Sequence, residues 1–171
     1  MPVYHDRGTS VDILESLEEL FYPVPKKILY CYGEHQKEFD DLSKTLQNIE
    51  FVGGFPDDFM YDLLSGHENS LVILDDLMSQ CSNDTRVSDL FTRGSHHRGI
   101  SVFFLTQNLF PPCKLSRTIS LNSYYMLIFR NPRDSLGIAT LARQMYSKNG
   151  DYSLESFKDA TARPYGYLLL D

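Results

Sequence analysis

Few features of the sequence suggest a secreted, membrane-spanning or metal-binding protein. Tryptophan is absent, and the three cysteines are odd in number, widely separated and without C-x-x-C spacing, so we expect reduced thiols rather than a disulfide framework or a zinc site. No run approaches the roughly 20 apolar residues that span a bilayer, and the N-terminus, MPVYHDRGTS, has neither the basic nor the apolar region of a signal peptide. These absences predict a cytoplasmic or nuclear protein that is not secreted and has no membrane partner.

The sequence also lacks a phosphate-binding loop. No segment matches G-x-x-x-x-G-K-[ST], the glycine-rich loop of nucleotide hydrolases. The backbone N–H groups of that loop, with the helix N-terminus that follows it, normally provide most of the grip on a nucleotide's phosphates. Without them we expect the affinity for ATP to collapse.

The chain has 171 residues, of which 42% are hydrophobic, and this suits one globular domain spanning 1–171. Its net charge is −7, but residues 1–85 hold 17 acids and 5 lysines and arginines, whereas residues 86–171 hold 6 and 11. A basic C-terminal half suits a nucleic acid or phosphate partner. The simpler interpretation is that the two halves compensate each other within the molecule.

Apolar runs predict five strands, at 27–32, 70–74, 101–106, 124–129 and 165–170. Most runs are continuous rather than alternating, as in strands buried on both faces of a parallel sheet. Helical patterns fall at 11–21, 38–47, 55–65, 85–93, 135–146 and 153–161. Strands that alternate with helices predict an α/β fold of three layers, in which helices flank both faces of a mainly parallel sheet.

An acidic pair follows the second of these strands. The segment LVILDD delivers Asp75 and Asp76 to the C-terminal edge of the sheet, where ligands bind in open α/β folds. In a Walker B strand of this form, the first acid holds Mg²⁺ and the second orients or deprotonates the attacking water. Adjacent acids at a strand end also occur as simple solvated caps.

The next strand, FFLTQ, ends in a polar residue and is preceded by basic residues. Gln107 at its end would reach the same edge and contact a γ-phosphate or the attacking water; the alternative is that it bonds backbone groups in the following loop. Ahead of the strand, TRGSHHRG offers Arg93 and Arg98 to phosphate oxygens of DNA or of a neighbouring subunit's nucleotide, for example as an arginine finger. His96 and His97 are interpreted as loop residues, because adjacent residues rarely converge on one metal ion.

At these residues the chain resembles the DNA-packaging ATPases of the FtsK/HerA-like P-loop NTPase branch, of the poxvirus type and of virus-like Polinton (Maverick) transposons. The resemblance runs from about residue 20 to residue 171, through ILYCYGEHQKEFD, LVILDDLM, LFTRGSHHRGISVFFLTQNLF, RTISLNSYYMLIFRNPRD, LARQMY and DATARPYGYLLLD. It implies a homo-oligomeric ring that threads double-stranded DNA into a capsid and uses ATP and Mg²⁺.

Carried over by position, Asp75 matches the metal-holding Walker B acid, Asp76 the catalytic acid beside it, and Gln107 the polar sensor on the next core strand. Arg93 and Arg98 match basic positions before that strand. Positions that resemble family positions near the nucleotide or the subunit interface, without individual roles, are Asn122, Arg130 and Asn131. A recurrent family segment whose chemistry the sequence does not reveal holds Tyr30, Tyr32 and Gln36, for which core packing or subunit contact is the simpler interpretation.

The chain departs from the family where the phosphate loop should be. Family members begin with a strand and G-x-x-x-x-G-K-[ST], whereas this chain has only HDRGTS, in which Gly8, Thr9 and Ser10 would be the remnant of the nucleotide-binding loop. The missing strand is central in this superfamily, between the strands ending at Gln107 and near Phe129. Either those two strands pair directly, or the chain is an N-terminally truncated copy of a longer protein.

The leading hypothesis is therefore an ATPase domain of viral or transposon DNA-packaging type that is impaired or inactive without its Walker A loop. The alternative is a non-catalytic DNA-binding or assembly module derived from such an ATPase. A third, minor alternative is an unrelated α/β phosphatase or receiver-like fold that uses Asp75 and Asp76 with a metal ion.

Overall fold

The computed structural model describes residues 14, 17–55, 69–77, 84–94, 99–110, 116–146, 148–164 and 166–171, apart from the side chains at positions 85, 88 and 93. The chain divides into two compact units, Met1–Thr106 and Gln107–Asp171. The first unit holds a four-stranded parallel sheet flanked by helices, and the second holds a small antiparallel sheet with helices of its own.

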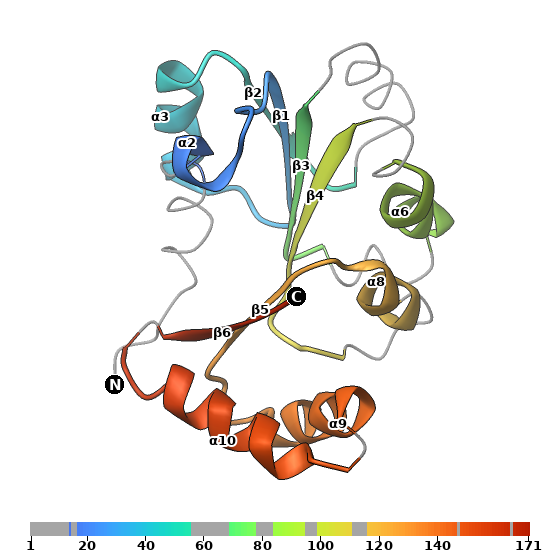
Figure 1. The fold of residues 1–171 in the computed structure, drawn as a ribbon. Helices are drawn as coiled ribbons and strands as arrows, with labels where there is room; N and C mark the ends of the chain where they lie inside the picture. The colour runs from blue at the N-terminus through green and yellow to red at the C-terminus, as the bar shows by residue number, and fades with distance from the viewer. Residues whose placement is uncertain are drawn as a thin grey trace. The chain divides into compact units, whose positions relative to one another are not determined.

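The sheet of the first unit has the strand order β2-β1-β3-β4, as Figure 1 shows. Its strands are β1 (Lys27–Tyr32), β2 (Ile49–Gly53), β3 (Ser70–Asp75) and β4 (Ile100–Leu105). All three pairings are parallel. The two inner strands are the most buried, because their apolar and β-branched side chains point into both faces of the sheet.

Helices α2 (Leu17–Leu20) and α3 (Lys37–Thr45) cover one face of this sheet. Phe39 of α3 is 2% exposed and is central to an aromatic cluster, which we define as Tyr30, Tyr32, Phe39 and Phe51. The ring centroids of Phe39 lie 4.9 to 5.1 Å from those of the other three members. This packing fixes where the two tyrosine rings lie near the C-terminal end of β1.

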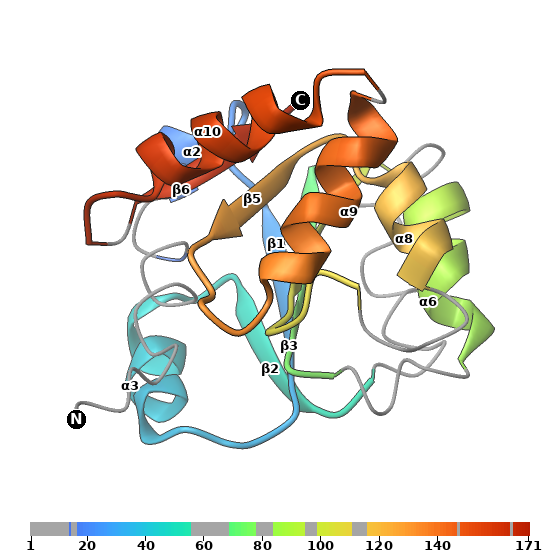
Figure 2. The ribbon, with the colours of Figure 1, turned by 90° about the horizontal axis from the view of Figure 1, so that it is seen from below.

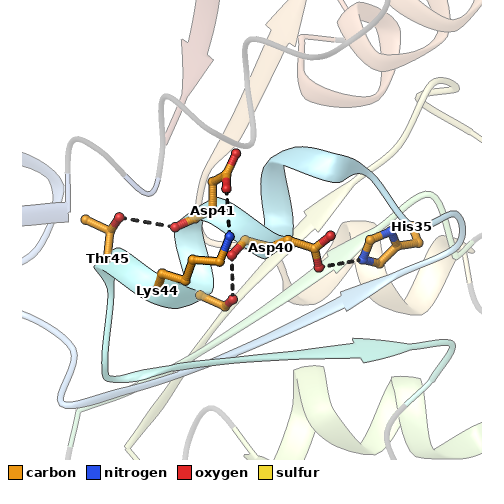
Figure 3. Close-up of polar contacts among 6 residues, drawn as sticks. His35, Asp40, Asp41, Lys44 and Thr45 are labelled. Atoms are coloured by element: carbon orange, nitrogen blue, oxygen red, sulfur yellow. Dashed lines mark hydrogen bonds and ion pairs between the residues drawn. The ribbon is translucent and has the colours of Figure 1, made fainter.

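The outer side of α3 is polar, as Figure 3 shows. Lys44 lies 3.0 Å from the carboxylate of Asp41, and the ring of His35 lies 3.3 Å from the carboxylate of Asp40. Both pairs are largely exposed, so each contributes little to stability. The helix is therefore stabilised mainly by its buried aromatic side.

The opposite face of the sheet is covered by α6 (Thr85–Asp89), which continues into a π-helical turn, η1 (Leu90–Gly94). Phe91 of this turn packs edge-on against Phe104 of β4, at a centroid distance of 6.2 Å. The helix begins at the N-cap residue Asp84, whose carboxylate accepts a hydrogen bond from the backbone N–H of Arg86.

The second unit contains α8 (Ser116–Asn122), β5 (Met126–Phe129), α9 (Ser135–Met145), α10 (Gly150–Ala160) and β6 (Tyr167–Leu170). Strands β5 and β6 pair antiparallel as a separate two-stranded sheet. Figure 2 shows α10 running along β6, with α9 beside it. Apolar side chains of the strands and helices, including Ile128, Leu168, Leu141 and Phe157, line a small pocket there.

The other face of the β5–β6 sheet is apolar and exposed. Leu127 pairs with Leu169, and Phe129 pairs with Tyr167 at a ring centroid distance of 5.8 Å. Each of these four side chains is between 41% and 54% exposed. The two strands therefore present apolar side chains on both faces, although α9 and α10 cover only one.

All five strands expected from the sequence are present, but they do not form one sheet. The last two pair antiparallel with each other as a two-stranded sheet. The sequence also gave no indication of β2 or α8. The predicted helix at 55–65 lies outside the described residues, apart from Phe55. Of the helix predicted at 11–21, Leu17–Leu20 is helical, and residues 11–13, 15 and 16 lie outside the described residues. Within the described residues, no helix is long and apolar enough to cross a membrane.

Candidate functional site

The acidic pair lies at the C-terminal end of β3, as LVILDD predicts. Five consecutive residues of β3, Ser70 to Leu74, are buried, Asp75 is partly exposed, and Asp76 is exposed. Asp76 has a φ of 52°, in the left-handed region, and Leu77 after it is fully buried. The chain thus makes a tight bend that exposes the Asp76 side chain between two buried anchors.

Asp75 is held by β1, the neighbouring strand. The hydroxyl of Tyr30 donates a hydrogen bond of 2.5 Å to Oδ2 of Asp75, and the backbone N–H of Gly33 donates to the Asp75 carbonyl oxygen at 3.0 Å. Tyr30 is fully buried, and its ring packs against those of Phe39 and Phe51, at centroid distances of 5.1 and 5.2 Å. A hydroxyl fixed in this way defines the orientation of the carboxylate that it contacts.

Gly33 allows the loops after β1 and β3 to approach each other closely. A Cβ at this position would lie 2.7 Å from the carbonyl oxygen of Asp76, closer than any side chain permits. The backbone N–H of Gly33 also donates a hydrogen bond to the carbonyl oxygen of Asp75, the residue before Asp76. The bend that carries the acidic pair is therefore fixed by backbone contacts as well as by Tyr30.

Gln107 lies two residues beyond the end of β4 and is the first residue of the second unit. Its side chain is exposed, and its backbone carbonyl accepts a hydrogen bond of 3.4 Å from the Asn131 side chain. Asn131 in turn accepts from the backbone N–H of Arg133 at 3.0 Å, which forms a turn after β5. The convergence of Gln107 with the acidic pair stays a prediction, whereas its contact with Asn131 joins two residues that the sequence singled out.

The predicted basic and loop residues are only partly described. The backbone of Arg93 lies in the π-helical turn η1, a rare geometry that is frequent at functional sites. The Arg93 side chain and the predicted site residues Arg98, Gly8, Thr9 and Ser10 lie outside the described residues. Their proposed contacts with phosphate stay predictions.

Strand β4 has a strand neighbour on only one side within the described chain. Its partner is β3, and β5 pairs instead with β6. Alternate residues of β4 therefore direct backbone N–H and C=O groups away from β3. The direct pairing of β4 with β5, one of the two outcomes expected for a sheet without its central strand, stays a prediction, because the two strands belong to different units.

Asp75 and Asp76 are the residues of this site that could hold a divalent cation. Mg²⁺ is commonly bound by one or two carboxylates, the remaining ligands being waters and substrate phosphates, and Asp75 with Asp76 offers that number. No group of three or more histidine, cysteine, aspartate or glutamate side chains is arranged around a metal position among the described residues. The described chain also includes no glycine-rich loop for phosphates.

The contribution of Tyr30 was not predicted from the sequence. Tyr30 and Asp75 are 45 residues apart, and the only signal was a tyrosine in an apolar strand that pairs with the strand of the acidic pair. Other singled-out residues have local roles: Gln36 is the N-cap residue of α3, and the Asn122 side chain donates to the Thr118 carbonyl at 2.8 Å. Arg130 is exposed.

In comparisons with known proteins, no protein-family model, no curated protein and no solved structure matches this chain. The functional assignment therefore rests on the residues and their geometry.

Proposed function

We propose that this chain derives from an ATPase domain of the viral or transposon DNA-packaging type and that, as it stands, it binds a divalent cation weakly but does not turn over ATP. The observation that carries the proposal is the parallel order β1-β3-β4 with Asp75 at the C-terminal end of its middle strand. Ligands of open parallel sheets bind at this edge.

The strand order gives further support. In the ATPases that the sequence resembles, the phosphate-loop strand lies between the strand that ends at Gln107 and the strand that ends near Phe129. In the described chain these are β4, which is the last strand of its sheet, and β5, which belongs to the second unit. An ATPase sheet without its phosphate-loop strand would be interrupted at this position.

The two acids would have different roles in such a site. Asp75, oriented by Tyr30, would hold Mg²⁺, which when bound supplies positive charge to phosphate oxygens. Asp76 is exposed on the bend after β3, where its carboxylate would orient or deprotonate water. Without the lysine-bearing loop, the phosphates lack their main backbone donors, and this is the physical reason to expect no turnover.

ATP turnover and cation binding test the proposal separately. We expect the purified chain to show background ATPase activity with Mg²⁺, and to bind Mn²⁺, a Mg²⁺ substitute, with an affinity of about millimolar that falls in Asp75→Asn. Robust hydrolysis that is abolished by Asp76→Asn would contradict the inactivity. Mn²⁺ binding that Asp75→Asn leaves unchanged would contradict the role of the acidic pair.

An engineered chain tests the descent from an ATPase. A strand and a G-x-x-x-x-G-K-[ST] loop are fused ahead of residue 9, and the control carries alanine in place of the loop lysine. We expect ATP hydrolysis in the first chain only, and we expect Asp76→Asn in that chain to lower turnover by about 100-fold or more without abolishing nucleotide binding. Equal background activity in both chains would count against the proposal.

A second candidate, a DNA-binding or assembly module, is favoured by the cations of the second unit. All four described ion pairs lie in the first unit. The basic residues described in the second unit are all exposed, and no ion pair is described for them: Arg117, Arg130, Arg133, Arg143, Lys148, Lys158 and Arg163. Exposed cations of this kind suit the phosphates of double-stranded DNA.

Assembly into a homo-oligomer belongs to the same proposal. The exposed apolar face of the β5–β6 sheet supports it, because paired leucines and aromatic rings in water mark surfaces that associate. Sedimentation velocity over a range of protein concentrations measures the oligomeric state directly. A concentration-independent monomer would contradict assembly by the isolated chain.

A further inference from the structure

We infer that Tyr30 is a positioning residue for the cation site: its buried hydroxyl fixes the rotation of the Asp75 carboxylate, so that this carboxylate meets a divalent cation in one orientation. The inference rests on the proposed cation-binding role of Asp75. It assigns a chemical role to a tyrosine for which packing was the simpler interpretation.

The sheet register brings the two residues together on one face. In the pairing of β1 with β3, Tyr32 is opposite Asp75 and Tyr30 is opposite Ile73. Side chains alternate between faces along a strand, so all four of these residues share one face, the one covered by α3. Tyr30 therefore reaches Asp75 diagonally, from one residue pair earlier in the sheet.

Packing holds the hydroxyl in place. Tyr30 is fully buried, and its ring packs against Phe39 and Phe51 of the aromatic cluster. Rotating the ring away from Asp75 would require these neighbours to move. The hydroxyl is thus a fixed donor, and the partly exposed carboxylate is the group that it orients.

The hydrogen bond is short. At 2.5 Å it lies at the short end of the range for a hydroxyl that donates to a carboxylate, the strong charge-assisted class. Groups that form a hydrogen bond with a metal-binding side chain fix the orientation of that side chain. Their removal commonly lowers metal affinity about 10- to 100-fold. A hydrogen bond that only satisfied a buried hydroxyl would leave metal affinity unchanged.

Tyr32 provides a matched control. It lies on the same strand and the same face, and it belongs to the same aromatic cluster. The described structure shows no hydrogen bond from its hydroxyl. Tyr30→Phe and Tyr32→Phe therefore each remove one hydroxyl from the cluster at nearly constant volume, but the hydrogen bond described to Asp75 is removed by the first.

The experiment measures Mn²⁺ affinity and the NMR signal of the Asp75 carboxyl carbon in the full chain and in these variants, with Asp75→Asn as the reference for loss of the site. We expect Tyr30→Phe to lower Mn²⁺ affinity about tenfold and to shift the carboxyl signal in the absence of metal, and we expect Tyr32→Phe to do neither. Thermal unfolding of each variant verifies that it is folded.

Two other outcomes are distinguishable. Mn²⁺ affinity that falls in Asp75→Asn but is equal in Tyr30→Phe and the unmodified chain overturns the positioning role and leaves the proposed cation site intact. Mn²⁺ binding that is absent, or unaffected by Asp75→Asn, overturns the cation site and the positioning role together. If Tyr30→Phe does not fold, the Tyr30 hydroxyl proton of the unmodified chain replaces it: a downfield, slowly exchanging signal that Asp75→Asn removes supports the contact, and its absence overturns it.

Discussion

Gly33 and Asp76 lie so close that a Cβ at position 33 would be 2.7 Å from the carbonyl oxygen of Asp76. The contact joins the loops after β1 and β3, 43 residues apart in sequence, at the edge of the sheet that carries the acidic pair. Backbone atoms cannot rotate away from an added methyl group as a side chain can, so this position accepts only glycine without a shift of the bend.

Replacing this glycine is therefore expected to affect both stability and the site. We predict that Gly33→Ala lowers the free energy of unfolding by about 1 to 3 kcal/mol and weakens Mn²⁺ binding, because the bend that holds Asp75 and Asp76 must move. Urea unfolding and Mn²⁺ titration measure the two effects. Gly53→Ala is the control, since the atoms nearest to a Cβ there belong to the Tyr32 side chain, at 3.6 Å or more, which is ordinary van der Waals contact; equal losses in both variants would contradict the prediction.

The N-cap of α9 offers a second test. Asp134 accepts a hydrogen bond of 3.0 Å from the backbone N–H of Gly137 and one of 3.3 Å from that of Leu109. We predict that Asp134→Ala lowers the free energy of unfolding by about 1 to 2 kcal/mol, whereas Asp134→Asn costs less because it keeps an acceptor. Asn149, the N-cap of α10, makes no capping hydrogen bond through its side chain, so Asn149→Ala should change stability little. A similar loss at both caps would contradict this account.

The N-cap of α6 predicts a pH dependence. The side-chain hydrogen bonds from Arg86 do most to lower the pKa of Asp84 below its ordinary 3.8; burial opposes them, and the backbone N–H and the charge of Arg86 lower it further. A lowered pKa in the folded state means that the carboxylate stabilises the fold fully above pH 3.8, and that this contribution is lost as pH falls through the folded-state pKa.

We therefore expect the stability difference between the unmodified chain and Asp84→Asn to be constant near neutral pH and to shrink below about pH 4. Asparagine keeps the capping acceptor but replaces the carboxylate oxygen that Arg86 bonds, so the difference reports the interaction of the ionised carboxylate with the Arg86 side chain. Denaturant unfolding at a series of pH values measures it. A difference that stays the same down to pH 2.5 would show that the Asp84–Arg86 pair does not act through its ionisation.

The exposed cations of the second unit predict salt-dependent DNA binding. We expect double-stranded DNA to bind at low salt, and we expect Arg130→Ala with Arg133→Ala to weaken binding across sequences and to reduce the salt slope by about 2, since each phosphate contact contributes about 0.9. Lys26→Ala with Lys44→Ala, which removes two exposed cations of the first unit, is the control. No binding at low salt, or equal losses in both double variants, would count against the DNA-binding module.

Local pattern was sufficient where a strand is buried along its whole length. Residues 27–32 and 70–74 were predicted as strands and are strands, because a continuous apolar run has few other ways to leave water. Strand β2 was missed, since IEFVG is short and carries Glu50, and its extended form depends on pairing with β1. Strand β6 was recognised, but its antiparallel pairing with β5 is a property of two distant segments that neither one encodes alone.

In the site, too, the local sequence determines some features and the tertiary structure determines others. The run LVILDD is enough to deliver Asp75 and Asp76 to a strand end, because apolar residues anchor the strand and ionised ones cannot follow them into the core. The Tyr30 hydroxyl on Asp75, the Gly33 backbone against Asp76 and the uneven pairing of cations between the units all required the fold. Burial preferences act residue by residue and can be read along a chain, whereas hydrogen bonds and close backbone contacts depend on which distant segments become neighbours.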